Sequence, residues 1–247
     1  MNMKSKSQRG FTILELLTTI AVIAILAAIL VPVTGVVRES ARRSHCANNL
    51  RQIGMSFQLY ASGHNNRLPA NIEEMGGVWA WDVTVNVIDD LINAGGGERD
   101  MFFCRSGAME DRMELWDFAV SRAGGVETGF RVIAYVLLLE NAPGLLPQYA
   151  NTHMTDPVRV PVEGGRTEQY EFVSASQREL AVDAVISMNG ESFDRVQGDS
   201  QHPDRTNHLD GPNPLGGNIL FLDGHVTWRA FADMDDEKIE GEPKFWW

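Results

Sequence analysis

The chain has 247 residues, of which 44% are hydrophobic and 22% are charged, so its composition is that of a globular protein with a substantial core. Its formal net charge of -12 argues against binding to nucleic acid, because the phosphate backbone repels an acidic surface. The two cysteines are too few for a disulfide-rich scaffold or a four-cysteine zinc site.

The amino terminus is a short polar segment followed by a long apolar one. Residues 1–10 are polar and basic, and residues 11–33 are mostly apolar, with Glu15 as their only charged residue. At about 1.5 Å per residue, a helix over residues 11–31 is about 32 Å long, which matches a hydrocarbon core of about 30 Å. A cleaved secretory signal has a shorter apolar stretch and a polar mature start, so we predict a retained transmembrane helix over residues 11–33.

Glu15 is the informative residue of this segment, because an ionisable group inside a membrane helix is costly and usually serves a partner. It lies five residues after Gly10, in the string Gly-Phe-Thr-Ile-Leu-Glu. This string resembles the processing signal of type IV prepilins and type II secretion pseudopilins. The resemblance implies that prepilin peptidase removes residues 1–10 by cleaving between Gly10 and Phe11 and then methylates Phe11. It also implies that Glu15 directs assembly by neutralising the new amino group, on the same or a neighbouring helix.

Residues 34–62 are predicted to continue the helix as an amphipathic segment that packs on a globular head. Their apolar side chains follow spacings of four and three residues, which places them on one helical stripe. The stripe consists of Cys46, Leu50, Ile53, Phe57 and Tyr60. An independent amphipathic membrane helix is the competing interpretation. Glycine, asparagine and proline at residues 63–69 predict the end of the helix.

Residues 63–247 are predicted to form the head, with short helices and then mainly strands. The expected helices are 82–93 and 109–122, and the expected strands are 130–139, 169–174 and 180–188. Asp223-Gly224 predicts a two-residue hairpin turn between strands 219–222 and 225–228. The predicted fold class is therefore α+β and type IV pilin-like, with a long amino-terminal helix packed on an antiparallel sheet.

Further strings resemble a pilin-like subfamily with a large head. They are residues 46–54, residues 66–69, Phe-Phe-Cys at 102–104, and a carboxy-terminal signature of His208 followed by Asp-Gly-His-Val at 223–226. Arg105 stands where the subfamily usually has proline, and the spacer after His208 is longer than usual. Cys46 and Cys104 would both lie outside the cytoplasm, where disulfides persist, so a bridge is favoured over two separate buried thiols.

The carboxy-terminal part contains candidate metal ligands but no recognised catalytic arrangement. No histidine or aspartate pair in residues 202–225 has a zinc-motif spacing, and no hydrolase elbow or P-loop is present. The major pseudopilins that the chain resembles bind calcium through a loop near the carboxyl end. The corresponding candidates are Asp204, Asn207, Asp210 and Asn213. Turn composition explains these residues equally well, so no cofactor and no enzymatic activity are expected, with calcium the one candidate.

The acidic tail from Asp233 ends in Phe-Trp-Trp at residues 245–247. We expect these aromatic side chains to pack back on the head, and the alternative is an exposed peg that docks a partner.

Together these features predict a structural subunit of a type IV pilus-like or type II secretion pseudopilus filament. The protein would cross the bacterial inner membrane once, with its head in the periplasm, and would assemble into a periplasmic or surface filament. Expected partners are other pilin-like subunits, prepilin peptidase, an inner-membrane assembly platform and membrane lipid, without nucleic acid. The alternative is a membrane-anchored periplasmic binding or enzymatic domain whose leader only mimics the motif. A pseudopilus, a pilus and a DNA-uptake fibre all remain open, as do a major and a minor role.

Overall fold

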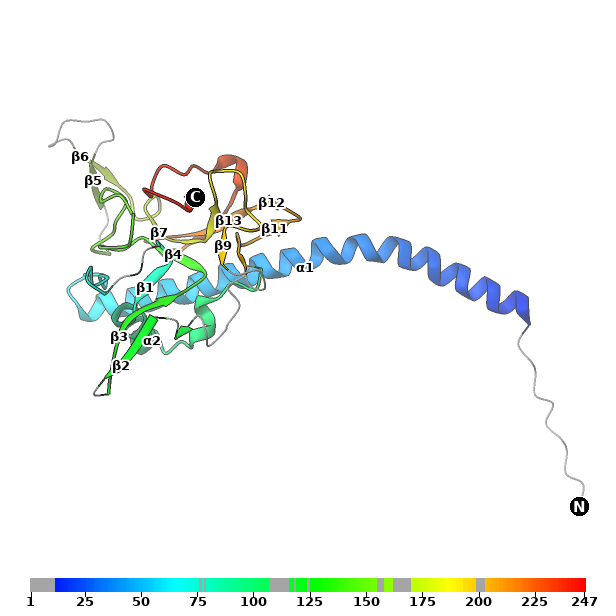
Figure 1. The fold of residues 1–247 in the computed structure, drawn as a ribbon, viewed down its shortest axis with the longest axis horizontal. Helices are drawn as coiled ribbons and strands as arrows, with labels where there is room; N and C mark the ends of the chain where they lie inside the picture. The colour runs from blue at the N-terminus through cyan, green and yellow to red at the C-terminus, as the bar shows by residue number, and fades with distance from the viewer. Residues whose placement is uncertain are drawn as a thin grey trace, which may run out of the picture. The chain divides into compact units, whose positions relative to one another are not determined.

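The computed structural model describes residues 12–75, 77, 79–106, 116–117, 119–123, 125–154, 158–161, 170–198 and 203–247. The chain divides into two compact units, Met1–Ala41 and Arg42–Trp247. Helix α1 spans Ile13–Gly63 and contributes to both units (Figure 1). The described residues form an α+β fold in which α1 packs on antiparallel sheets.

Within the second unit, α1 turns its apolar stripe into the core. Cys46, Leu50, Ile53 and Phe57 are all fully buried, and Tyr60 lies at the edge of the stripe and is half-buried. The helix ends at Gly63, and Asn65 and Asn66 follow it with positive φ, so the polar stop segment leaves the helical path as expected.

The central sheet has four antiparallel strands in the order β14-β13-β7-β4. These strands are β4 (Tyr135–Leu137), β7 (Glu179–Asp183), β13 (Gly216–Phe221) and β14 (Val226–Ala230). The two central strands, β7 and β13, are almost entirely buried, which their β-branched and leucine side chains permit. Because β7 lies between β4 and β13, Asp183 at the end of β7 is close to residues from both of these strands.

A second sheet has three antiparallel strands in the order β1-β3-β2. These are β1 (Asp82–Thr84), β2 (Ala119–Ala123) and β3 (Val126–Val132). Helix α2 (Val85–Gly95) follows β1 and ends where Gly96 takes a left-handed conformation with φ of 65°. The short 3₁₀ helix η1 (Arg99–Phe102) then leads to Cys104.

Four two-stranded ribbons and a second 3₁₀ helix complete the described elements. The ribbons are β5 (Val158–Pro161) with β6 (Tyr170–Val173), β8 (Val185–Ser187) with β15 (Lys244–Trp246), β9 (Gln197–Gly198) with β10 (Pro203–Asp204), and β11 (Leu209–Asp210) with β12 (Asn213–Pro214). The 3₁₀ helix η2 covers Phe231–Asp233.

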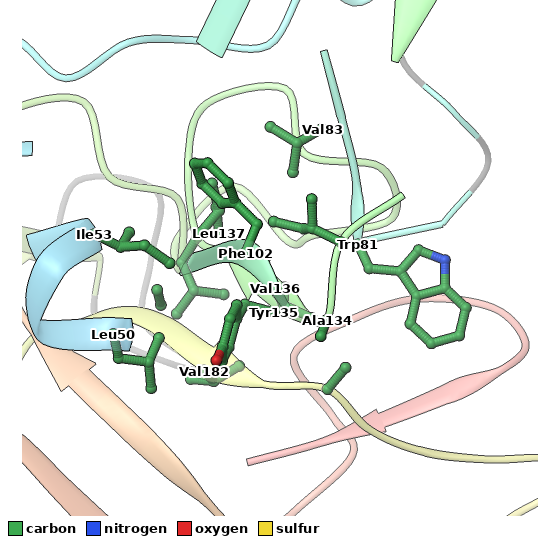
Figure 2. Packing of buried hydrophobic residues seen from close by; sticks show 14 of the residues in the cluster. Leu50, Ile53, Trp81, Val83, Phe102, Ala134, Tyr135, Val136, Leu137 and Val182 are labelled. Atoms are coloured by element: carbon green, nitrogen blue, oxygen red, sulfur yellow. The ribbon is translucent and has the colours of Figure 1, made fainter. Parts of the chain in front are cut away.

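The core forms where α1, η1 and the central sheet meet. Figure 2 shows Leu50 and Ile53 of α1 facing Tyr135, Val136 and the ring of Phe102. The carboxy-terminal aromatics join the same core, because Phe245 and Trp247 are 2% and 0% exposed. The tail therefore packs on the head as expected, and these two aromatic side chains do not form an exposed peg.

The helix predicted over 109–122 is wrong in its described carboxy-terminal part. Residues 107–115 and 118 lie outside the described residues, but Ala119–Ala123 form β2. This strand pairs antiparallel with β3, with Ala123 opposite Val126, so partner strand pairing overrides the local helical preference. The helix predicted over 82–93 begins three residues late, because Asp82–Thr84 pair with β3 as β1.

The two-residue turn predicted at Asp223-Gly224 is also wrong, although the hairpin itself is present. Leu220 pairs with Val226, Phe221 N–H donates to His225 O at 3.0 Å, and Gly224 N–H donates to Phe221 O at 2.9 Å. Only Gly224 of the turn has positive φ, at 90°. The connection is therefore a three-residue loop with glycine at the left-handed position, in which aspartate keeps an ordinary backbone conformation.

Candidate functional site

The start of α1 is a reciprocal cap made by Thr12 and Glu15. The backbone N–H of Glu15 donates to Thr12 Oγ1 at 3.2 Å, and the N–H of Thr12 donates to Glu15 Oε2 at 2.9 Å. The Thr12 hydroxyl also donates to Glu15 Oε2 at 2.8 Å. This is the capping-box arrangement, and it holds the carboxylate at the amino-terminal end of the helix. Gly10 and Phe11, the predicted cleavage residues, lie outside the described residues.

The amino-terminal part of α1 carries large apolar side chains that no other described residue of its unit covers. The large apolar residues from Ile13 to Ile29 are each between 53% and 86% exposed. They point to all sides of the helix, so no single face of another element would bury them all. An uncovered apolar surface of this kind marks a site of association.

No helix within the described part of the chain is long and apolar enough to cross a membrane. The transmembrane span predicted over residues 11–33 is therefore not confirmed.

Two family models match the chain. One is described as the prokaryotic N-terminal methylation motif and matches residues 5–31. The other is described as a protein of unknown function (DUF1559) and matches residues 36–87. These matches support a type IV pilin-like family. No curated protein and no solved structure matches the chain.

The matched ranges cover the features on which the pilin-like resemblance depends most. Residues 5–31 include Gly10, Phe11 and Glu15, and residues 36–87 include the buried stripe of α1. The carboxy-terminal signature at residues 208–226 lies beyond both matches, so the large-head subfamily is not confirmed.

In the head, a disulfide joins Cys46 of α1 to Cys104, which follows η1. Next to it, the Asn49 side-chain amide donates to Phe103 O at 2.9 Å and to the Tyr135 hydroxyl at 3.3 Å. Burial, with the nearby charge of Asp183, raises the pKa of Tyr135 well above its ordinary value. These contacts attach the helix to the loop after η1 and to β4.

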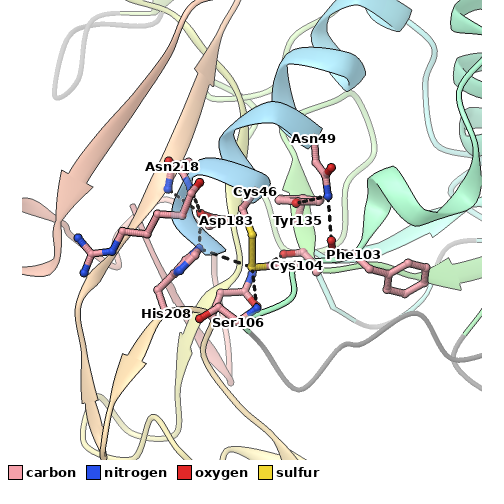
Figure 3. A network of polar contacts seen from close by, with 12 residues as sticks. Cys46, Asn49, Phe103, Cys104, Ser106, Tyr135, Asp183, His208 and Asn218 are labelled. Carbon is pink, nitrogen blue, oxygen red and sulfur yellow. Dashed lines mark hydrogen bonds and ion pairs between the residues drawn. A yellow bond between two sulfur atoms is a disulfide. The ribbon is translucent and has the colours of Figure 1, made fainter. Parts of the chain in front are cut away.

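His208 and Asp183 complete this buried polar cluster (Figure 3). His208 is fully buried, and its Nε2 lies 3.2 Å from Asp183 Oδ2 and 3.5 Å from Cys104 Sγ. Asp183 Oδ2 accepts hydrogen bonds from the backbone N–H of Asn218 at 2.7 Å and from its side-chain amide at 2.8 Å. The ring of Trp228 packs edge-on against the ring of His208, with the two ring centroids 5.3 Å apart and an interplanar angle of 83°.

The sequence reasoning missed Asp183 and Asn218. A usable signal was present, since Asp183 is the only charged residue of the apolar stretch Leu-Ala-Val-Asp-Ala-Val-Ile at residues 180–186. A carboxylate inside a buried strand requires hydrogen-bond donors or a cation nearby. The sequence alone did not indicate which residues would supply them.

The calcium candidates occupy different settings. Asn207 is buried and its amide donates to Ala134 O at 2.8 Å. Asp210 and Asn213 are exposed and oppose each other in the β11–β12 ribbon, and Asp204 pairs with Gln197 in the β9–β10 ribbon. The calcium site stays a prediction.

Proposed function

We propose that the protein is a structural subunit of a type IV pilus-like or type II secretion pseudopilus filament. The carrying observation is the match to the N-terminal methylation motif over residues 5–31, which contains Gly10, Phe11 and Glu15. In this proposal prepilin peptidase cuts between Gly10 and Phe11 and methylates Phe11. The role is structural, in keeping with the pilin-like families that carry this motif.

The exposed apolar part of α1 supports assembly through the helix. Until it is assembled, membrane lipid covers this surface, and in the filament the same surface packs against the helices of other pilin-like subunits. Identical head-to-tail contacts that do not close produce a helical filament rather than a ring. The head then lies in the periplasm or on the cell surface, and an inner-membrane platform adds the subunits.

The capping box suggests how Glu15 is prepared for its partner. Its carboxylate is already drawn toward the helix start by Thr12. Cleavage after Gly10 would create a positive amino group on the residue directly before Thr12, in the same subunit or a neighbouring one. Pairing removes two isolated charges from an apolar setting, where each alone is costly.

Mass spectrometry of the amino-terminal peptide, from protein purified from its native membrane, tests the processing step. The expected result is a chain that begins at Phe11 and carries one added methyl group. An intact Met1 terminus in cells with active peptidase would favour the membrane-anchored binding or enzymatic domain. A start well beyond residue 33 would indicate secretion and would remove Glu15 from the mature protein.

Substitutions at residue 15 test the assembly step and separate it from helix capping. Glu15→Gln removes the charge but keeps an oxygen that can accept the Thr12 N–H, so the cap persists. We expect Glu15→Gln and Glu15→Ala both to abolish filaments in sheared-fraction and electron-microscopy assays, while the head stays folded. Glu73→Gln, an exposed carboxylate in the head, is the matched control and should assemble normally. Normal assembly of Glu15→Gln would refute charge pairing.

A further inference from the structure

We propose that Cys46, Cys104, His208 and Asp183 form a zinc site in the reduced state of the head. The disulfide form and the zinc form are then two alternative states of the same buried cluster. In both states the cluster joins α1 to the central sheet. This proposal does not depend on the filament role.

Four ligand atoms lie close together, although the two sulfurs are bonded to each other in the disulfide and would separate on reduction. One sulfur from each cysteine, a ring nitrogen of His208 and a carboxylate oxygen of Asp183 all lie within 4.8 Å of one another. Zinc bonds of about 2.0 to 2.3 Å place tetrahedral ligands roughly 3.3 to 3.8 Å apart. His208 Nε2 already lies 3.2 Å from Asp183 Oδ2 and 3.5 Å from Cys104 Sγ, whereas the two sulfurs must move apart once the disulfide is reduced. Two thiolates, an imidazole and a carboxylate are all zinc ligands, and the set is closed, as in structural sites.

The strongest evidence that a cation fits here is the environment of the Asp183 carboxylate. Its side chain is buried, and Oδ1 has no hydrogen-bond partner among the described residues. A buried carboxylate oxygen without a donor is costly, and a metal bond would satisfy it. The other oxygen, Oδ2, is held by two N–H donors of Asn218, which fixes the orientation of the carboxylate. Such outer contacts orient the ligands of metal sites.

The surroundings of Cys104 suit a thiolate. The backbone N–H of Ser106 lies 3.5 Å from Cys104 Sγ, two residues along the chain, and points to the sulfur as a donor. N–H donors to sulfur stabilise the negative charge of a metal-bound thiolate more than they stabilise a neutral disulfide. His208 Nε2 faces the same sulfur and Asp183, so it points toward the centre of the group.

The change from the disulfide form to the zinc form requires a reductant, which we take to be a dithiol. The dithiol transfers two electrons and two protons to the Cys46–Cys104 bond, gives two thiols, and itself becomes a disulfide. Zn²⁺ then binds both sulfurs and releases the two thiol protons, so binding weakens as pH falls. Oxidation reverses the sequence and expels the metal, because a disulfide sulfur is no longer an anionic ligand.

An open groove adjoins the cluster and offers an approach for metal and reductant. It has a volume of about 390 Å³ and is lined by side chains that include Arg43, Asn218 and Trp228. Asn218 and Trp228 also contact Asp183 and His208. These two side chains therefore line the groove and contact the proposed ligands.

Zinc analysis of the full chain in detergent tests the proposal directly. The protein is reduced with a dithiol under anaerobic conditions, incubated with Zn²⁺, desalted and analysed for metal, alongside the oxidised protein. We expect about one zinc per reduced chain and none on the oxidised chain. Co²⁺ in place of Zn²⁺ should give thiolate-to-cobalt charge-transfer absorption and the intense visible bands of a tetrahedral site.

Variants identify the ligands and guard against a folding artefact. Asp183→Asn and His208→Ala should each lower zinc affinity at least tenfold, and Asn218→Ala should lower it by about 10- to 100-fold through the orientation of Asp183. His225→Ala, which changes an exposed histidine directly after the hairpin loop, is the control and should bind zinc normally. Circular dichroism of each variant checks that the fold is kept. If a variant unfolds, its zinc affinity is set aside, and the cobalt spectrum of the wild-type chain tests the proposal instead.

Three results would overturn the proposal. One is a folded, reduced chain with two titratable thiols and no bound zinc. Another is a cobalt spectrum without thiolate charge transfer. The third is a disulfide that cannot be reduced unless the chain unfolds, because the zinc state would then be inaccessible.

Discussion

Removing the disulfide should destabilise the head by an amount that the loop length sets. The bridge closes a loop with a sequence separation of 58 residues. In the chain-entropy relation, a loop of this size reduces the entropy of the unfolded chain by about 14 cal/mol/K, which is about 4 kcal/mol at 25 °C. Replacing Cys46 and Cys104 together with alanine should therefore lower the free energy of unfolding by about 4 kcal/mol.

Urea unfolding of the full chain in detergent, followed by tryptophan fluorescence, measures this change, because Trp81 and Trp247 are buried and report on the core. The double variant is compared with the wild-type protein in its oxidised and reduced states, all with a metal chelator present. The reduced wild type should match the double variant. A loss of less than about 1 kcal/mol would show that the folded head does not depend on this cross-link, and the loop-closure reasoning would fail.

Further expectations concern packing, pH and solubility. Gly95→Ala should lower the free energy of unfolding by about 1 to 3 kcal/mol, because a Cβ there would lie 1.9 Å from the Ser56 hydroxyl oxygen. The control is Gly63→Ala, whose Cβ would meet no atom within 4 Å, and it should leave stability unchanged in the same urea assay. Burial and the charge of Asp183 raise the pKa of Tyr135, so the folded state keeps a proton that the unfolded state loses above pH 10. Unfolding measured on either side of pH 10 should show stability falling as pH rises, and less steeply in Tyr135→Phe. A chain without its first 35 residues should sediment as a soluble monomer, and self-association would contradict assembly through the removed segment.

The stripe of α1 shows what local pattern reasoning predicts well. Four of the five residues chosen by helical spacing are fully buried, and the helix ends at the glycine that was expected to stop it. Both features depend on the 3.6-residue period and on local backbone preferences, which are properties of neighbouring residues. The same holds for the hairpin of β13 and β14, whose glycine was correctly identified even though the loop has three residues.

The incorrect helix over residues 109–122 shows where local reasoning fails. Ala119–Ala123 become a strand because β3 provides hydrogen bonds along their full length. Arg122 of that strand bonds Glu127 of β3 at 2.7 Å, which joins the two sides of the hairpin, and it also bonds Asp117 ahead of β2 at 2.7 Å. The helix or strand propensity of a single segment contains no information about the strand that will pair with it or about ion pairs to that strand.

The sequence by itself determined the pilin-like amino terminus and the role that we propose for it. In the function that we propose, a processing enzyme reads a short linear segment, and such a segment is visible in the sequence without knowledge of the head. Only the tertiary structure showed that Asp183 and His208 join the two cysteines in one buried cluster of the head. Cys46, Cys104, Asp183 and His208 come from a helix, a loop, the central sheet and a late connection, and none of their spacings forms a metal motif. They meet because α1 packs against the central sheet and the disulfide joins it to the loop after η1, and such long-range packing leaves no periodic trace in the chain.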